Sequence, residues 1–338
     1  ALVGAIPFVL LEDPALSYVD AFFESMSGLT TTGATIITRI NDLPRGILFY
    51  RQQLQWLGGM GIIVLAVAIL PMLRIGGMQL YRAETPGPLK DTKLTPRITE
   101  TAKALWLIYL GITVLCALSY WLGGMQMFDA VGHAFSTVAI GGFSTHDQSF
   151  AYFDNPTLEV VAIIFMFVAG MNFALHFSAW RKASAQPYFQ DSELKAYTAI
   201  IVVFSLLAIV VLMFDGVYDD LFESARFGVF QVVSALTTTG FTSTDFYLWP
   251  GFLPLMLVCL AFIGGCAGST AGGIKVIRVV LLYRQSVREI RRLIHPHAVL
   301  PVKFGGRTAA PTVLEAVMGF FFLFTASTLL MTIALRAT

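Results

Sequence analysis

Charged residues are scarce in this chain, and their scarcity argues against an ordinary soluble domain. Asp, Glu, Lys and Arg make up 13% of the 338 residues, whereas soluble domains average about 25%. The net charge of +1 gives no indication of a nucleic-acid partner. Hydrophobic residues make up 56% of the sequence, so a lipid bilayer is the environment to consider first.

Cysteine is rare, and neither metal-ligand clusters nor a nucleophile paired with a base can be found in the sequence. Each of the three cysteines lies in an apolar run, and their spacing predicts neither a disulfide framework nor a metal site: Cys116, Cys259 and Cys266. Three histidines are isolated from one another, and we expect them to make structural hydrogen bonds: His133, His146 and His176. The sequence therefore does not predict an enzyme or a bound cofactor.

Long, nearly charge-free runs are what the chain contains instead. A helix needs about 20 such residues to cross a hydrocarbon core about 30 Å thick. The fold class predicted from these runs is an all-α, multi-pass membrane protein. The runs are residues 62–73, 105–122, 158–177, 197–214, 252–263, 276–282 and 313–335.

The two ends of the chain lie in or beside apolar segments. It begins inside the stretch ALVGAIPFVLL, with no initiator methionine and no visible signal peptide, and it stops just beyond another apolar run. We therefore expect the sequence to be part of a longer protein.

Charge is sorted along the sequence, and the sorting predicts an orientation. Three connections, at about 74–103, 181–195 and 275–307, hold 17 of the 22 Lys and Arg residues. The positive-inside rule places these connections in the cytoplasm. Twelve of the 21 acidic residues lie in or beside the segments rich in threonine and glycine, which we therefore expect on the opposite face of the membrane.

Three related threonine- or glycine-rich stretches recur between the apolar runs. They are SGLTTTGATIIT from Ser27, STVAIGGFSTHD from Ser136 and SALTTTGFTSTD from Ser234. About ten apolar or small residues precede each stretch, enough for about 15 Å of helix, or half a bilayer. Spacing to flanking aspartates pairs Gly142, rather than Gly141, with Gly33 and Gly240.

The recurrence divides the chain into helix–pore loop–helix repeats. Each repeat combines an apolar helix, a half-length helix ending in the stretch, a second apolar helix and a basic connection. The predicted units are 1–73 (repeat one, first helix truncated), 74–103 (cytoplasmic connection), 104–184 (repeat two), 190–286 (repeat three, broken second helix), 287–310 (cytoplasmic connection) and 311–338 (first helix of a truncated repeat four, opened by Pro311).

A single TTTG is an ordinary helix end, but three copies favour the lining of a pore. Non-helical backbone at membrane depth is tolerated where it lines a water-filled cavity or is buried in protein. Glycine allows successive carbonyl groups to turn toward one side, and rings of carbonyl oxygens can replace the hydration shell of a cation. The C-terminal end of each short helix adds partial negative charge.

Three further features have alternative interpretations. The glycine-rich segment 264–273 should break the last helix of repeat three and face the pore, although small residues also allow close helix packing. Ile274 separates Gly273 from Lys275, so a phosphate-binding loop is excluded.

The GGMG at 58–61 is interpreted as helix packing rather than a second gate. Arg51 either reaches the membrane interface or supports the wall of the pore.

The chain resembles the TrkH/KtrB superfamily of potassium transporters, and its TrkH branch in particular, over essentially its whole length. The motifs that carry the resemblance are FFESMSGLTTTGAT, YRQQLQWLGGMGIIVLAVAILP, GGMQLYRAETPGP, FSTVAIGGFSTHD and FIGGCAGSTAGGIKVIR. The resemblance implies four repeats around a pseudo-fourfold axis, a homodimer with one pore per protomer, and a cytoplasmic nucleotide-binding ring partner, TrkA. It also implies that this chain supplies three of four filter strands and cannot close a pore alone.

Site residues follow from the resemblance position by position. The K+ filter would be formed by Thr31, Thr32, Gly33, Ile140, Gly141, Gly142, Thr238, Thr239 and Gly240. The gating loop would be Gly264, Gly265, Cys266, Ala267, Gly268, Ser269, Thr270, Ala271, Gly272 and Gly273, with Lys275 and Arg278 at the cytoplasmic exit. We expect a bacterial inner-membrane protein with periplasmic pore loops, whose basic segment 283–297 contacts solvent, lipid headgroups or the ring partner.

Potassium is the ion that the resemblance favours, because all three filter glycines are present. A sodium-permeable or sodium-coupled relative is the first alternative. An intramembrane enzyme using Ser269 or Cys266 and a non-conducting structural subunit are more distant ones.

Overall fold

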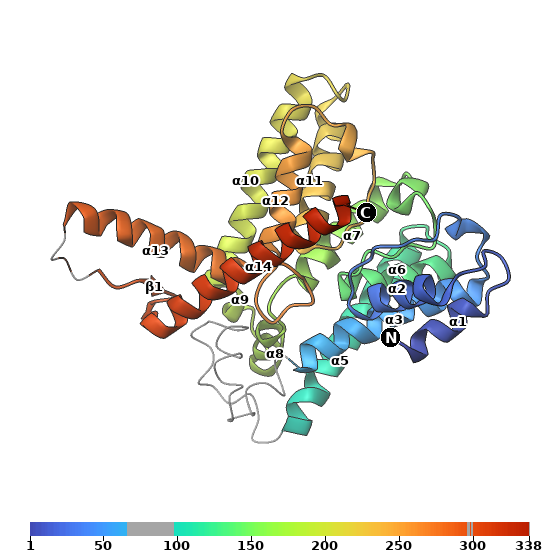
Figure 1. The fold of residues 1–338 in the computed structure, drawn as a ribbon, viewed down its shortest axis with the longest axis horizontal. Helices are drawn as coiled ribbons and strands as arrows, with labels where there is room; N and C mark the ends of the chain where they lie inside the picture. The colour runs from blue at the N-terminus through green and yellow to red at the C-terminus, as the bar shows by residue number, and fades with distance from the viewer. Residues whose placement is uncertain (66–97, 296–297, 299, 338) are drawn as a thin grey trace.

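The computed structural model describes residues 1–65, 98–295, 298 and 300–337, and the regular secondary structure in these ranges is almost entirely helical, as predicted (Figure 1). A short antiparallel hairpin, β1 (Lys303–Phe304) and β2 (Arg307–Thr308), was not predicted. The end of the second helix of repeat one (66–73), most of the connection 74–103 and the GGMQLYRAETPGP motif lie outside the described residues.

Three of the described helices are long and apolar enough to cross a membrane. They are α5 (Ile98–Leu122), α10 (Ser192–Phe214) and α14 (Pro311–Ala337). A fourth span is possible if α7 (Pro156–Ala169) and α8 (Phe173–Lys182) are counted together, although the two are bent by 89°. These helices agree with the predicted multi-pass membrane protein by length and composition.

The bend between α7 and α8 divides the apolar run 158–177, which the sequence presents as one segment. Asn172 caps α8, because its side-chain oxygen accepts a hydrogen bond from the Ala174 amide at 2.9 Å. The Gly170 carbonyl accepts from the Cys266 amide at 2.9 Å, and the Phe173 amide donates to the Gly268 carbonyl at 3.0 Å. Peptide groups freed at the bend are thus satisfied by a segment almost 100 residues away.

Three shorter helices precede the threonine- and glycine-rich stretches: α2 (Tyr18–Leu29), α6 (Met127–Ala139) and α11 (Leu221–Thr237). Their 12, 13 and 17 residues correspond to about 18, 20 and 25 Å of helix. Ser17 caps α2 and Asp220 caps α11, each accepting from the amide three residues on. All three helices end where the sequence predicts a change to extended backbone.

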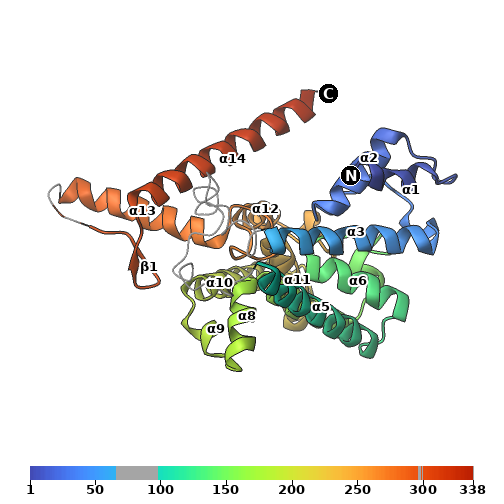
Figure 2. The same cartoon turned by 90° about the horizontal axis from the view of Figure 1, so that it is seen from below.

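The remaining helices surround these short ones. Helix α3 (Arg45–Ile63) lies against both α2 and α6, and both views show the three helices together (Figures 1 and 2). Helices α10 and α12 (Leu253–Ile263) flank α11, while α13 (Val276–Ile294) extends away from the bundle. The minor helical elements are η1 (Val3–Ala5), α1 (Ile6–Val9), η2 (Ile40–Asp42), η6 (Ser149–Tyr152), α9 (Gln186–Gln190) and η7 (Phe246–Leu248).

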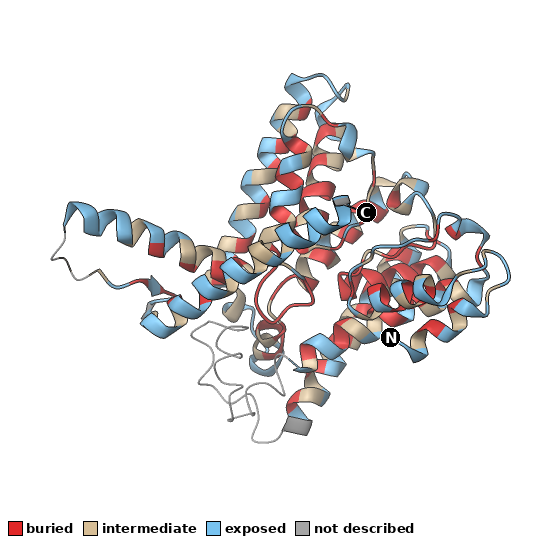
Figure 3. Cartoon of the chain, in the orientation of Figure 1, coloured by how far each residue is buried: buried red, intermediate tan, exposed pale blue. Residues whose placement is uncertain are grey.

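Burial is concentrated in one large apolar cluster that joins α5, α6, α7, α10, α11 and α12 (Figure 3). Helices α6 and α11 are buried along most of their lengths, whereas α14 and the outer half of α13 are largely exposed. A separate apolar cluster packs the hairpin between α13 and α14, through Ile277, Leu281, Val302, Phe304, Leu314 and Val317.

Two glycines of the GGMG sequence allow α3 to approach the ends of the short helices. A Cβ atom at Gly58 would collide with the Leu29 carbonyl oxygen, at the end of α2. One at Gly59 would lie 3.0 Å from Ala139, the last residue of α6. Gly61 has no such neighbour within 4 Å among the residues that the structure describes. These contacts support the helix-packing interpretation of the motif.

Gly58→Ala is expected to lower the free energy of unfolding by about 1–3 kcal/mol, because the added methyl group must displace backbone. Gly61→Ala on the same helix is the matched control and should be neutral or slightly stabilising. Thermal unfolding of the purified protein in detergent, followed by tryptophan fluorescence, distinguishes the two. Equal midpoints for both variants would contradict the packing role of Gly58.

Candidate functional site

The three short helices end in the same backbone turn, although their sequences differ. A left-handed residue follows each helix, with φ of 54° at Thr31, 54° at Ile140 and 63° at Thr238. Ile140 and Thr238 come directly after α6 and α11, whereas Thr31 is the second residue after α2. The next amide donates at 2.9 Å to the carbonyl five residues back in every case: Thr32 to Ser27, Gly141 to Ser136 and Thr239 to Ser234. This is the hydrogen-bond pattern of a Schellman cap. A left-handed threonine or isoleucine is strained, so the surrounding structure must impose the turn.

A glycine with positive φ follows two residues later in each segment. The φ angles are 78° at Gly33, 78° at Gly142 and 83° at Gly240, a conformation that residues with side chains rarely adopt. Gly142, not Gly141, occupies this position in the second segment. We name residues 31–33, 140–142 and 238–240 the central segments.

The central segments lie side by side. A Cβ atom at Gly33 would collide with the Gly141 carbonyl oxygen, and one at Gly142 would collide with the Thr239 carbonyl oxygen. The glycines therefore allow each segment to approach the peptide group of the next. Gly240 has no neighbour within 4 Å of such a Cβ among the described residues.

Gln55 of α3 holds the second central segment. Its Nε2 donates to the Gly141 carbonyl at 2.6 Å, and its Oε1 accepts from the Phe143 amide at 3.1 Å. A Cβ atom at Gly141 would collide with this side chain, which explains the second glycine of the pair. Sequence reasoning did not identify Gln55, because its partner is 86 residues away.

The first and third segments use their own hydroxyl groups instead. Thr30 bonds to Thr32 at 2.8 Å, and Thr237 bonds to Thr239 at 2.7 Å. Ser234 donates to the Phe241 carbonyl at 2.8 Å, and Ser27 makes the equivalent bond to the Ala34 carbonyl at 2.5 Å. The sequence Ala139–Ile140–Gly141 offers no hydroxyl at the corresponding positions, so α3 supplies the polar partner.

Arg51, one helical turn before Gln55, is fully buried and does not reach the interface. It forms an ion pair of 2.7 Å with Glu24 of α2, whose side chain is also fully buried. Its guanidinium lies 4.2 Å from the centre of the Phe143 ring and donates to the Ser144 carbonyl at 3.3 Å. Thr35 donates to Glu24 at 3.0 Å. Arg51 thus supports the chain just beyond two of the central segments.

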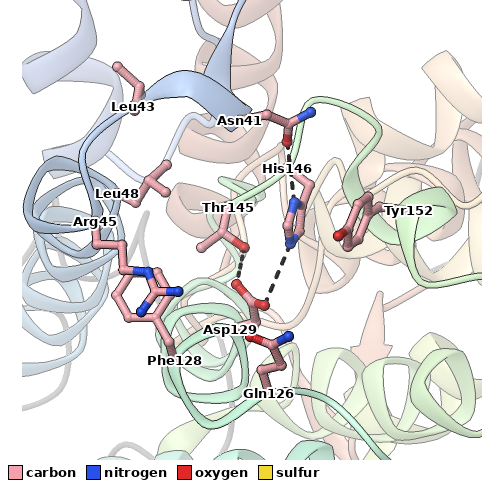
Figure 4. Close-up of a pocket in the computed structure, with 10 residues that line it drawn as sticks. All are labelled: Asn41, Leu43, Arg45, Leu48, Gln126, Phe128, Asp129, Thr145, His146 and Tyr152. Carbon is pink, nitrogen blue, oxygen red and sulfur yellow. Dashed lines mark hydrogen bonds and ion pairs between the residues drawn. The ribbon is translucent and has the colours of Figure 1, made fainter.

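Polar contacts also join the loops that follow the first and second segments (Figure 4). Asp147 accepts from the Ile40 amide at 2.7 Å, and His146 Nδ1 lies 3.2 Å from the Asn41 side-chain oxygen. Thr145 donates to Asp129 at 2.7 Å. A cavity of about 520 Å³ opens between these loops. The hydrogen bonds of His133 to Ser144 and of His176 to Tyr188 agree with the expected structural role of these histidines.

The segment 264–273, which we name the glycine loop, separates α12 from α13 and packs directly against the central segments. The Gly272 amide donates to the Thr238 hydroxyl at 2.7 Å. Thr270 donates to the Val138 carbonyl at 3.1 Å, and Ala271 forms a small apolar cluster with Ile140 and Ala169. Positive φ angles at Gly264, Gly268 and Gly273 explain the glycines at these positions.

The other side of the glycine loop is anchored to repeats two and three. Besides the contacts at the α7–α8 bend, the Ala267 amide donates to Glu193 of α10 at 2.7 Å. Lys275 donates from Nζ to the Ala271 carbonyl, and Arg278 lies 4.0 Å from the centre of the Phe320 ring of α14. Lys275 and Arg278, predicted at the cytoplasmic exit, therefore both turn toward protein, and Arg278 is buried.

Comparison with known proteins gives a consistent result. A family profile described as TrkH, cation transport protein, matches residues 3–338. The Trk system potassium uptake protein TrkH of Salmonella typhimurium is 56% identical over 319 residues, covering 94% of this chain and 66% of the relative. That of Halomonas elongata is 54% identical over 337 residues, covering 100% and 70%.

Structural comparison agrees. The crystal structure of the potassium transporter TrkH from Vibrio parahaemolyticus superimposes with a TM-score of 0.89 at 48% identity, covering 99% of this chain and 68% of that one. The chain thus spans about two thirds of the length of the curated relatives it matches.

Arg51→Met is expected to destabilise the protein by about 3–5 kcal/mol, because it leaves the Glu24 carboxylate buried without its partner. Adding Glu24→Leu to this variant should recover part of the loss, since both charges are then removed. Thermal unfolding of the two single variants and the double variant tests the pairing. Strictly additive losses would show that the two side chains act independently.

Proposed function

This chain belongs to the TrkH family of cation transport proteins, and from that membership we propose that it forms part of a potassium uptake pathway. The relatives named above are potassium uptake proteins. The observation that carries the proposal is the side-by-side placement of three chemically different segments with one shared backbone turn. Membership of a transporter family argues against the alternative that the chain is an intramembrane enzyme using Ser269 or Cys266.

The central segments are proposed to form the ion filter. Thr31, Thr32 and Gly33, Ile140 to Gly142, and Thr238 to Gly240 would present peptide oxygens in place of water around K+. The collisions predicted for a Cβ at Gly33 and Gly142 support this arrangement, because adjacent segments approach as closely as backbone allows. A fourth segment, implied by the resemblance, would occupy the open side of Gly240.

The alternative to selectivity for K+ is a pathway that also conducts Na+. Each segment contains one positive-φ glycine, and the site is therefore shorter than a filter with several consecutive carbonyl rings. We propose selectivity for K+ with weaker discrimination against Na+ than in a dedicated potassium channel.

The glycine loop is proposed to act as the gate. Residues 264–273 adjoin the central segments on the side of the basic connections, and two hydroxyl contacts hold them there, at Thr238 and Thr270. Each such hydrogen bond contributes about 1 kcal/mol, so a regulator could release the glycine loop at a small cost in free energy. Lys275 and Arg278 would move with the loop toward the cytoplasmic exit.

The surroundings of the pathway are proposed from the family as well. We propose a bacterial inner-membrane protein with its central segments reached from the periplasm. It would assemble as a homodimer and bind a cytoplasmic nucleotide-binding ring protein of the TrkA kind. Potassium is cargo here, and no bound cofactor is proposed.

Gly142→Ala in the full-length protein is expected to reduce rubidium uptake into proteoliposomes at least about tenfold, which a loss of 1.4 kcal/mol in ion stabilisation produces. The physical reason is the collision with the Thr239 carbonyl, which displaces an oxygen that would contact the ion. Gly61→Ala is the control. Unchanged rubidium flux would contradict the filter assignment, and equal sodium and rubidium fluxes in the unmodified protein would contradict potassium selectivity.

Thr270→Val is expected to raise basal rubidium flux severalfold, because it removes the hydroxyl that fixes the glycine loop to the Val138 carbonyl. Ser269→Ala is the matched control, since the Ser269 hydroxyl donates to the Cys266 carbonyl within the loop itself. Flux is measured without the ring partner, which separates loop release from regulation. If both variants conduct alike, the contact at Thr270 does not restrain the gate.

A further inference from the structure

A basic groove lies between the outer half of α13 and the hairpin. Arg284, Arg288 and Arg291 line it from α13, and Lys303 lines it from β1. The groove encloses about 400 Å³ and is walled by Tyr283, Val287 and residues 300–302. Four cationic side chains therefore converge on a space large enough for a phosphorylated headgroup.

The position of the groove is fixed by packing. The apolar cluster that includes Val302 and Phe304 holds the hairpin against both α13 and α14. Arg284 donates to the Lys303 carbonyl and lies 5.7 Å from the Phe304 ring, which ties the two walls together. Helix α14, long enough to span a membrane, begins at Pro311, three residues after β2 ends. The groove consequently lies beside the first residues of a helix that is long and apolar enough to span a membrane.

The charges of the groove are only partly neutralised. Glu289 is the one acidic residue in the sequence 283–294, and it pairs with Arg288 at 2.9 Å and with Arg292 at 3.4 Å. The hydrogen bond from Arg288 lowers the pKa of Glu289, so this carboxylate is ionised at neutral pH. Within the part of the chain that the structure describes, neither Arg291 nor Lys303 forms an ion pair.

We propose that this groove binds the headgroup of an anionic phospholipid in the leaflet facing the basic connections. The phosphate would occupy the space between Arg288, Arg291 and Lys303, each of which is a donor to phosphate oxygens. The basic side of a membrane protein faces a negatively charged leaflet, to which each nearby Lys or Arg adds attraction. The proposal does not depend on which ion the protein conducts.

Apolar side chains beside the groove favour a lipid over a soluble anion or an acidic protein. Ile290, Leu293 and Ile294 of α13 are 59%, 84% and 69% exposed. A basic helix that exposes such residues is suited to the boundary between headgroups and acyl chains. Acyl chains of a lipid held in the groove could cover these side chains and the exposed surface of α14 together.

The test uses the full-length protein, delipidated in detergent and titrated with phosphatidylglycerol or phosphatidylcholine under native mass spectrometry. We expect phosphatidylglycerol to bind more tightly than phosphatidylcholine. The double variant Arg288→Gln, Arg291→Gln should weaken the binding of one phosphatidylglycerol about tenfold or more, given the attraction that each cation contributes. Arg292→Gln removes the same charge from the same helix outside the groove lining and should have little effect.

Three further arms identify the source of the ligand. The variant Arg288→Lys, Arg291→Lys keeps both charges and should retain most of the lipid binding, even if the glutamine variant folds poorly. Millimolar inorganic phosphate should not displace the lipid; displacement would indicate a site for a free anion instead. Equal binding of both lipids, or equal weakening by the double variant and the Arg292 control, would overturn the proposal. The proposal would also fail if the glutamine double variant lost binding to an acidic cytoplasmic protein while its lipid binding stayed unchanged.

Discussion

Peptide groups that leave a helix inside a membrane must find partners within the protein, and this requirement governs the centre of the structure. The chain meets it with one repeated solution: a left-handed residue follows each short helix, and the next amide bonds back to a carbonyl of that helix. The strain at these turns is tolerated because α3 packs against the first and second segments and the glycine loop packs against the second and third. The proposed filter would therefore expose backbone oxygens to an ion without exposing unpaired backbone to lipid.

The side chains that support this turn differ among the repeats. Hydroxyl groups near Thr32 and Thr239 bond within their own segments, whereas Gln55 reaches across from α3 to the second segment. Arg51 and Glu24 add a buried charge pair beside the same region. The three central segments are thus alike in backbone and individual in their polar contacts, as expected when geometry is the property that must be kept.

Much of this organisation could be predicted from local sequence. The short helices, the glycine of each segment and the break after Ile263 all have signals within a few residues, because glycine and threonine act on their own backbone. Gln55, the ion pair of Arg51 and the bend at Gly170 could not be found in this way. Each depends on a partner far along the chain, and an isolated Gln, Arg or Gly in an apolar run does not indicate which peptide group it will meet. The hairpin at 303–308 has strands too short to produce a periodic pattern.

The elbow between α7 and α8 has a mechanical implication. Its peptide groups at Gly170 and Phe173 are bonded to Cys266 and Gly268, so the two broken helices form a single interlocked joint rather than two independent hinges. A displacement of either one must drag or release the other. The α7–α8 pair and the α12–α13 pair would then move together. A displacement of the far end of α13 could therefore reach α7 and α8, which precede it by about 100 residues in the sequence.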